Sequence, residues 1–152
     1  MKRGSEVLAL SKRVYNLLKP LSKKIEIVGS IRRKNPNPVD IDIVIIPKDK
    51  TKIFETMSKL GKLKEGGDKK IYFNVQGIDV EIYFAEPEYW GAMLLAYSSK
   101  RGSGIGLRLV AKRQGFHLSQ YGLFKNGKFI AGKTEKEIYE ALGREYKKPE
   151  ER

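Results

Sequence analysis

The chain has no cysteine and a single histidine, His117, among its 152 residues. Without cysteine there can be no disulfide bond and no thiolate metal site, and one histidine excludes a histidine-rich metal site. Absence of cysteine fits a reducing compartment, and the N-terminal residues lack the apolar block of a signal peptide. We therefore expect an intracellular protein that works where its substrate resides, in the cytoplasm or elsewhere.

Long apolar stretches are also missing from the sequence. No hydrophobic run approaches the roughly 18 residues of a membrane span, so we expect no membrane partner. Apolar residues nevertheless make up 40% of the chain, enough for the packed core of one domain or of two small lobes. The sequence contains no internal repeat, and we expect a monomer.

Acidic residues are scarce relative to basic ones. Lysine and arginine number 31 against 18 aspartates and glutamates, which gives a net charge of +13. A positive field of this size favours polyanions, with nucleic acid ahead of an anionic membrane. The alternative is a lysine-rich surface of the kind found on thermophilic proteins, with no polyanion bound.

The first half of the chain alternates between helical and strand patterns. Apolar residues at helical spacing predict a helix over 5–19, which Pro20 ends, and a second helix over 50–60. Short apolar runs predict strands over 25–28, 39–46, 69–75 and 78–84, with residues 30–38 as a loop. Gln76-Gly77 separates the last two runs and indicates a hairpin.

The second half begins where the composition shifts at Glu86-Pro87. The pattern predicts helices over 88–97, 105–114 and 135–143, with a Gly/Ser loop over 98–104. Asn126-Gly127 predicts a hairpin between residues 121–125 and 128–131. Thr134 is expected to cap the last helix, because Glu137 stands at the capping-box position.

Two aspartates interrupt the apolar run at 39–46. Asp40 and Asp42 are two residues apart, so in a strand they point to the same face. Paired carboxylates at this spacing can bind Mg²⁺ together with phosphate oxygens of a substrate. The alternative is an edge strand with one solvated face, which the alternation alone would also allow.

A third carboxylate favours the metal-binding interpretation. Asp79 alternates with apolar residues in the run 78–84, and it would lie near Asp40 and Asp42 if the two strands pair. Three carboxylates can hold two Mg²⁺ ions, and Asp79 could then activate a hydroxyl nucleophile. Glu81 shares the face of Asp79 and would be either a further carboxylate of the site or, as we expect, the partner of a lysine.

A short basic turn precedes the acidic pair: Gly29-Ser30-Ile31-Arg32-Arg33. Ser30 can offer its hydroxyl and backbone N–H to a phosphate oxygen, and Arg33 can pair with a triphosphate. Positive charge there would stabilise a pyrophosphate leaving group. Arg32 is the candidate for a structural role, and a solvated basic turn is the alternative for the whole segment.

Together these motifs resemble the family X DNA polymerases of the nucleotidyltransferase superfamily. The likeness covers Gly29-Ser30-Ile31-Arg32-Arg33, Asp40-Ile41-Asp42 and Ile78-Asp79-Val80, and later Leu118-Ser119-Gln120-Tyr121-Gly122-Leu123-Phe124 and Thr134-Glu135-Lys136-Glu137. It implies an α+β fold: a nucleotidyltransferase palm with a mixed β-sheet and backing helices over 1–86, and a small helical thumb with a β-hairpin over 87–152.

The resemblance also implies roles for individual residues. Asp40, Asp42 and Asp79 would be the catalytic carboxylates and the ligands of two Mg²⁺ ions, for which Mn²⁺ could substitute. Nucleotide contacts would come from Gly29, Ser30, Arg33 and Tyr97. DNA contacts would come from Arg108 and from the neighbouring cations on or beside the same helix: Lys100, Arg101, Lys112 and Arg113.

The implied reaction is DNA-directed addition of dNTPs to the 3′ end of a primer on gapped or primer-template DNA. The chain resembles the minimal viral members that have palm and thumb alone, so gap filling in repair without lyase activity is expected. It departs from the family at Ala96 and Gly104, where an aromatic residue and an asparagine are usual. A template-independent terminal transferase or another nucleotidyltransferase is the alternative enzyme, and a nucleic-acid-binding module is the non-enzymatic one.

Overall fold

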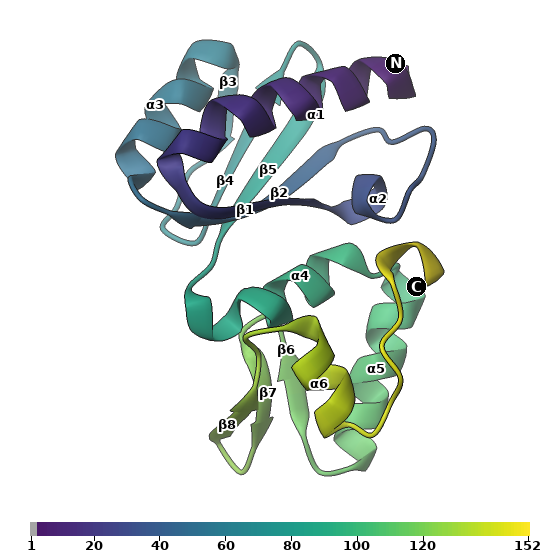
Figure 1. Cartoon of the computed structure of the whole chain (residues 1–152). Helices are drawn as coiled ribbons and strands as arrows, with labels where there is room; N and C mark the ends of the chain where they lie inside the picture. The colour runs from purple at the N-terminus through teal and green to yellow at the C-terminus, as the bar shows by residue number, and fades with distance from the viewer. Residues whose placement is uncertain (1–2) are drawn as a thin grey trace. The chain divides into compact units, whose positions relative to one another are not determined.

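The structure, a computed structural model, describes residues 3–152, without the side chains of residues 101–105. The chain divides into two compact units, and the division falls between Ala85 and Glu86. Figure 1 shows the helices and strands of each unit. None of the described helices is sufficiently long and apolar to cross a membrane.

The N-terminal unit contains a five-stranded sheet in the order β1-β2-β5-β4-β3. Its strands β2 and β5 run parallel and every other neighbouring pair is antiparallel, so the predicted mixed sheet is confirmed. The strands are β1 Ser22–Val28, β2 Ile41–Pro47, β3 Lys62–Glu65, β4 Lys70–Val75 and β5 Ile78–Phe84. The helices are α1 Gly4–Leu18, the 3-10 turn η1 Lys19–Leu21, α2 Gly29–Arg32 and α3 Lys50–Leu60.

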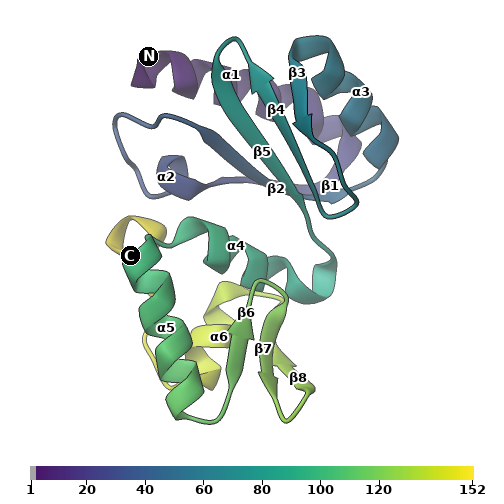
Figure 2. The same ribbon diagram turned by 180° about the vertical axis from the view of Figure 1, so that it is seen from behind.

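Helices α1 and α3 cover one face of this sheet, and Figures 1 and 2 show no helix from the described residues of the N-terminal unit on the other face. Helix α1 buries Val7, Leu10 and Val14 at helical spacing, as its sequence predicts. Helix α3 starts where the Asp49 carboxylate accepts a hydrogen bond from the Lys52 N–H at 3.1 Å. The core contains every second residue of the central strands, among them Ile41, Ile43, Ile45, Val80 and Ile82.

Four details of this unit differ from the sequence-based expectation. Strand β2 begins at Ile41, so Asp40 precedes the strand instead of lying inside it. Strand β1 extends back to Ser22 because an edge strand can carry exposed lysines. Strand β3 was not expected, since all four of its residues are exposed and give no apolar alternation. The start of the expected loop at 30–38 is the short helix α2.

The C-terminal unit combines three helices with a three-stranded antiparallel sheet in the order β6-β7-β8. The helices are α4 Trp90–Ser98, α5 Arg101–Arg113 and α6 Glu135–Ala141, with 3-10 turns η2 Pro87–Tyr89 and η3 Pro149–Glu151. The strands are β6 His117–Ser119, β7 Gly122–Lys125 and β8 Lys128–Ala131. A small core of Leu95, Ala111, Leu123, Ile138 and Leu142 joins them.

The turn and cap signals of this unit predicted its structure well. Asn126 and Gly127 both adopt positive φ, 51° and 76°, as a two-residue hairpin requires. The Thr134 hydroxyl accepts a hydrogen bond from the Glu137 N–H at 3.1 Å, which confirms the predicted cap.

The prediction of a Gly/Ser loop over 98–104 is wrong beyond Lys100, because helix α5 begins at Arg101. Each glycine disfavours a helix by only about 1 kcal/mol relative to alanine, and helix α5 forms over this segment despite three of them.

A buried ion pair ties α6 to the last residue of the sequence. The Arg152 Nη1 donates to Glu135 Oε2 at 2.7 Å, and its Nε donates to the Lys147 carbonyl at 3.0 Å. The guanidinium lies against the rings of Tyr139 and Tyr146, 5.8 and 5.5 Å from their centroids. Both charged side chains are almost fully buried, so the ion pair neutralises charges that water cannot reach.

Candidate active site

Four carboxylates share the helix-free face of the N-terminal sheet. Asp42 in β2 is directly opposite Glu81 in β5, and Asp79 precedes Glu81 by two residues on the same strand. Asp40 lies two residues before Asp42, at the entrance to β2. Since alternate residues of a strand point the same way, the parallel pairing gathers these acids on one surface.

Tyr83 and Lys70 contact the carboxylates from neighbouring positions. The Tyr83 hydroxyl donates to Glu81 Oε2 at 2.5 Å and lies 3.4 Å from Asp42 Oδ1. Lys70 Nζ lies 3.4 Å from Glu81 Oε1, which confirms the expected lysine partner of Glu81. Glu81 nevertheless belongs to the acidic face, because it also acts electrostatically on Asp42 and Asp40.

The crowded negative charge changes the protonation of the site. Burial, reinforced by the charges of Asp40 and Glu81, raises the pKa of Asp42 to about 7. Burial and the charges of Glu81 and Asp79 also raise the pKa of Asp40, whereas the nearby Arg33 guanidinium opposes this change. A cation bound among these oxygens would relieve the repulsion.

The donors of this face suit a hard divalent cation, since all are carboxylate oxygens and carry excess negative charge. In the part of the chain that the structure describes, no three His, Cys, Asp or Glu side chains form a ready-made metal cluster. Hydrogen bonds instead hold individual carboxylates: Tyr83 binds Glu81, and the Asn74 amide binds Asp79 at 2.9 Å. The acids match such an ion in the chemistry and charge of their oxygens, but in the described residues they are not gathered into a site of three ligands.

The basic turn lies beside this acidic face. Gly29 has φ +66°, and a Cβ atom there would come within 2.6 Å of Asp42 Oδ2, so the position requires glycine. Ser30 is half-buried in α2, and Arg33 follows the helix close enough to act on Asp40. Arg32 lies 3.5 Å from Glu26 Oε1, which agrees with the structural role expected for it.

Metal-free protein should show the effect of Asp42 on stability. A folded-state pKa near 7, above the ordinary value of 3.8, means that the folded state favours protonated Asp42. The stabilisation of the folded state by protonated Asp42 is fully present below about pH 4 and is lost as the pH rises to about 7. In EDTA, Asp42→Asn should therefore melt progressively higher than wild type over this range, by on the order of 4 °C or more at pH 7.5.

Thermal melts from pH 4 to 8 with and without Mg²⁺ measure this effect. The difference between variant and wild type should shrink when Mg²⁺ is added, because a bound cation stabilises only the protein that keeps its carboxylate. Asp68→Asn, at an exposed carboxylate before β4, serves as the matched control. If the difference in Tm between Asp42→Asn and wild type does not change with pH, Asp42 does not have the raised pKa assigned to it.

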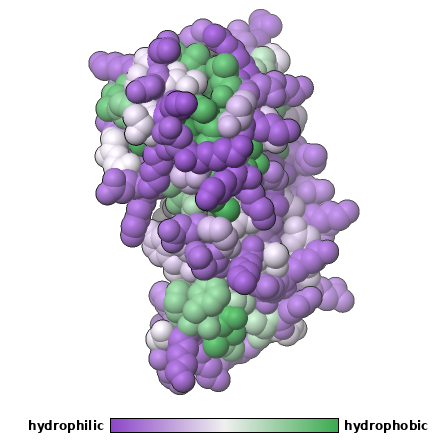
Figure 3. Space-filling model, turned by 60° about the vertical axis from the view of Figure 1, so that its left-hand side comes forward, coloured by the Kyte–Doolittle hydropathy of each residue, from purple (hydrophilic) through white to green (hydrophobic). Residues whose placement is uncertain are grey.

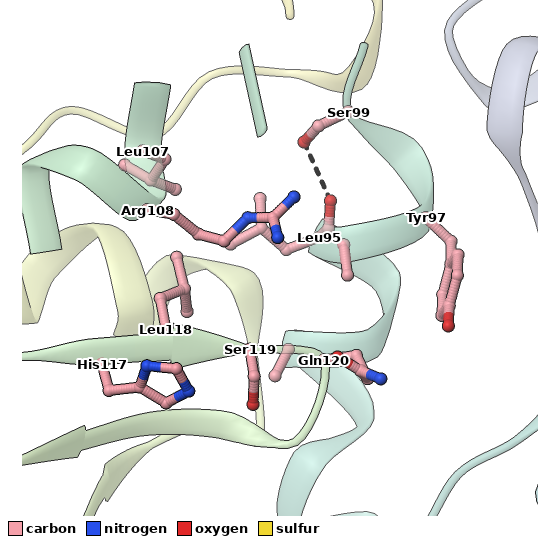
Figure 4. Close-up of a pocket in the computed structure, with 11 residues that line it drawn as sticks. Leu95, Tyr97, Ser99, Leu107, Arg108, His117, Leu118, Ser119 and Gln120 are labelled. Atoms are coloured by element: carbon pink, nitrogen blue, oxygen red, sulfur yellow. Dashed lines mark hydrogen bonds between the residues drawn. The ribbon is translucent and has the colours of Figure 1, made fainter. Parts of the chain in front are cut away.

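The remaining predicted site residues belong to the C-terminal unit. Tyr97 in α4 and Arg108 in α5 line a pocket of about 350 Å³, shown in Figure 4. The Ser99 hydroxyl at its edge donates to the Leu95 carbonyl at 2.8 Å. His117, Ser119 and Gln120 complete the polar lining; the segment 118–124 carries part of the family resemblance, but no site role was predicted for these three residues. Their contribution depends on β6, a strand that was not predicted.

The other candidate DNA contacts follow helix α5. Lys100 precedes its first residue and is exposed, and Lys112 and Arg113 are exposed in its last turn. The side chain of Arg101 lies outside the described residues. Exposed cations therefore lie just before the first residue of α5 and in its last turn, while Ala111 faces the core.

Known proteins match the sequence of this chain across both units. Residues 104–152 match the family model described as DNA polymerase beta thumb. The repair DNA polymerase X from two isolates of African swine fever virus is 30% identical over 152 residues, spanning 91% of this chain and 87% of each viral protein. DNA polymerase IV of Saccharomyces cerevisiae is 34% identical over 62 residues, 41% of this chain and 11% of the yeast protein.

The matches extend across the acidic sheet and the C-terminal helices, which is the organisation of a nucleotidyltransferase that acts as a DNA polymerase. The chain belongs to family X of the DNA polymerases.

Proposed function

We propose that this polymerase fills gaps during DNA repair, adding dNTPs to a primer 3′ end under the direction of a template. The supporting observation is the parallel pairing of β2 with β5, which places the strands of Asp42 and Asp79 side by side. The viral relatives carry repair in their names. In this proposal residues 1–86 form the catalytic palm and residues 87–152 the thumb.

Asp40, Asp42 and Asp79 would hold two Mg²⁺ ions, with Mn²⁺ as a substitute. When bound, such ions supply stabilisation of the attacking and leaving oxygens in an in-line displacement at phosphorus. Asp79 would also accept the proton of the primer 3′ hydroxyl. The carboxylates act here as anions, so protonation of Asp42 would oppose the reaction.

The basic turn would bind the incoming nucleotide. Gly29 lets the backbone of the basic turn lie next to Asp42, because a Cβ atom at this position would clash with that carboxylate. Ser30 and Arg33 would hold the triphosphate, and charge-assisted bonds to the departing pyrophosphate stabilise the transition state. Tyr97 would contact the nucleotide from α4.

DNA would bind through phosphate contacts from helix α5 and the residue before it: Lys100, Arg101, Arg108, Lys112 and Arg113. The chain carries a net charge of +13, and most of the surface visible in Figure 3 is hydrophilic. Phosphate contacts release counterions and give affinity without reading sequence. Such binding suits an enzyme that must act at any gap.

Primer extension on gapped, recessed and single-stranded DNA, with each dNTP and rNTP, tests the proposed function. We expect templated dNTP addition in the presence of Mg²⁺, fastest on gapped DNA. Addition without a template would instead indicate a terminal transferase, and preferential use of rNTPs would indicate another nucleotidyltransferase. DNA binding without nucleotide addition under any condition would indicate that the protein is a nucleic-acid-binding module and not an enzyme.

Replacing Arg108 and Lys112 by alanine should reduce the salt dependence of DNA binding. Each lost phosphate contact lowers the slope of log K against log[salt] by about one, so the double variant should lose about two. Fluorescence anisotropy with gapped DNA from 50 to 200 mM salt measures the slope. Lys128→Ala/Lys133→Ala, which removes two exposed lysines of the same unit outside α5, should retain the wild-type slope. Equal slopes for all three proteins would refute contact through α5.

A further inference from the structure

Asn74 connects the hairpin turn of β4 and β5 to the Asp79 carboxylate. Its Nδ2 donates to Asp79 Oδ1 at 2.9 Å, and its Oδ1 accepts the Gly77 N–H at 3.1 Å. Asn74 and Asp79 are direct cross-strand partners in the antiparallel pair. The residue therefore lies next to a proposed catalytic carboxylate, although it cannot itself carry charge.

The turn fixes which end of the amide faces Asp79. Gln76 and Gly77 both adopt positive φ, 55° and 84°, as a two-residue hairpin turn requires. The Gly77 N–H donates to the Asn74 side chain, and within an amide group only the oxygen can accept. The amide NH₂ must then face Asp79, so both hydrogen bonds depend on one orientation of one side chain.

A second side chain of β4 lies on the same face as Asn74. Tyr72 lies two residues before Asn74, and its interaction with the Asp79 carboxylate raises the pKa of Tyr72. A carboxylate can accept about four hydrogen bonds. The Asn74 hydrogen bond therefore orients Asp79 and leaves it able to bind a cation or accept a proton.

We propose that Asn74 is a positioning residue for nucleotidyl transfer, which holds the Asp79 carboxylate in place through an amide that the Gly77 N–H fixes. This inference rests on the proposed role of Asp79. Hydrogen-bond partners of ligating carboxylates typically change metal affinity or activity by 10–100-fold when they are removed. Lysine or arginine in this position would compete with a cation for Asp79, whereas a neutral amide orients the carboxylate without neutralising it.

Two substitutions separate this role from a merely structural one. Asn74→Asp keeps an oxygen for the Gly77 N–H but loses the donor to Asp79 and places a like charge beside it. Asn74→Ala loses both hydrogen bonds. We expect Asn74→Asp to lower kcat by about 10–100-fold with KM for dNTP changed by less than about 2-fold. We expect Asn74→Ala to weaken Mn²⁺ binding about 10-fold, measured by electron paramagnetic resonance on protein without DNA or dNTP.

Gln76→Glu is the matched control, because it adds a negative charge to the same exposed turn without the contact to Asp79. Its kcat and Mn²⁺ affinity should equal those of wild type. Thermal melts establish that each variant is folded at the assay temperature. If Asn74 serves only the turn, Asn74→Asp will have wild-type kcat and Asn74→Ala will melt lower but bind Mn²⁺ normally, and either result overturns the inference.

Asp79→Asn in the same assays distinguishes this inference from the proposed function. Loss of extension in Asp79→Asn together with wild-type behaviour of both Asn74 variants refutes the role of Asn74 alone. Full activity of Asp79→Asn refutes the catalytic role of Asp79 and, with it, any positioning of that residue by Asn74.

Discussion

Asp79→Asn should lower primer extension by about 10³-fold or more, while affinity for gapped DNA stays near the wild-type value. The substitution preserves the shape of the side chain but removes its negative charge and its ability to accept a proton. Asp79 is only half-buried on the helix-free face of the sheet, so the variant should fold normally. Single-turnover extension assays and anisotropy with the same gapped DNA measure the two quantities.

The matched control for Asp79→Asn is Asp68→Asn, which removes the same charge from an exposed loop before β4. Its extension rate should be unchanged. A second comparison, Glu81→Gln, tests whether the fourth carboxylate matters as much. Because Glu81 is ion-paired with Lys70 at 3.4 Å and bound by Tyr83, we expect a smaller loss than for Asp79. Extension by Asp79→Asn at the wild-type rate would exclude it from the reaction.

Local sequence signals predicted most of the framework of this site. The apolar runs around Asp42 and Asp79 identified two strands. The sequence placed these acids together only on the condition that the two strands pair, and β2 and β5 do pair. The turns at Gln76-Gly77 and Asn126-Gly127 were predicted from residues that tolerate positive φ. The strands and the turns could be predicted because each depends on neighbouring residues alone.

The contacts that refine the site depend on cross-strand register, which no local pattern encodes. Tyr83 approaches both Asp42 and Glu81 only because β2 and β5 align Asp42 with Glu81. Asn74 reaches Asp79 because the hairpin is two residues long and places them opposite each other. In the same way, the pocket of Tyr97 and Arg108 requires β6, whose three residues are too few to show alternation.

Arg152→Ala should destabilise the C-terminal unit by about 3–5 kcal/mol, because it leaves Glu135 buried without its cation. The Glu135 side chain is 7% exposed and that of Arg152 is 1% exposed, so water cannot replace the lost partner. The substitution also removes the guanidinium from the rings of Tyr139 and Tyr146. Urea unfolding followed by circular dichroism measures the change, and Arg144→Ala, at an exposed arginine of the same unit, should cost less than about 1 kcal/mol.

The double variant Arg152→Met/Glu135→Leu shows whether the loss comes from the unpaired charge or from lost packing. Apolar replacements of similar size remove both buried charges together, and such exchanges are often neutral or stabilising. The pair does not satisfy every polar atom, since among the described residues Arg152 Nη2 has no hydrogen-bond partner. We therefore expect the double variant to recover at least half of the stability that Arg152→Ala loses. If Arg152→Ala unfolds at the wild-type urea concentration, or the double variant is no more stable than Arg152→Ala, the ion pair does not stabilise this unit by charge neutralisation.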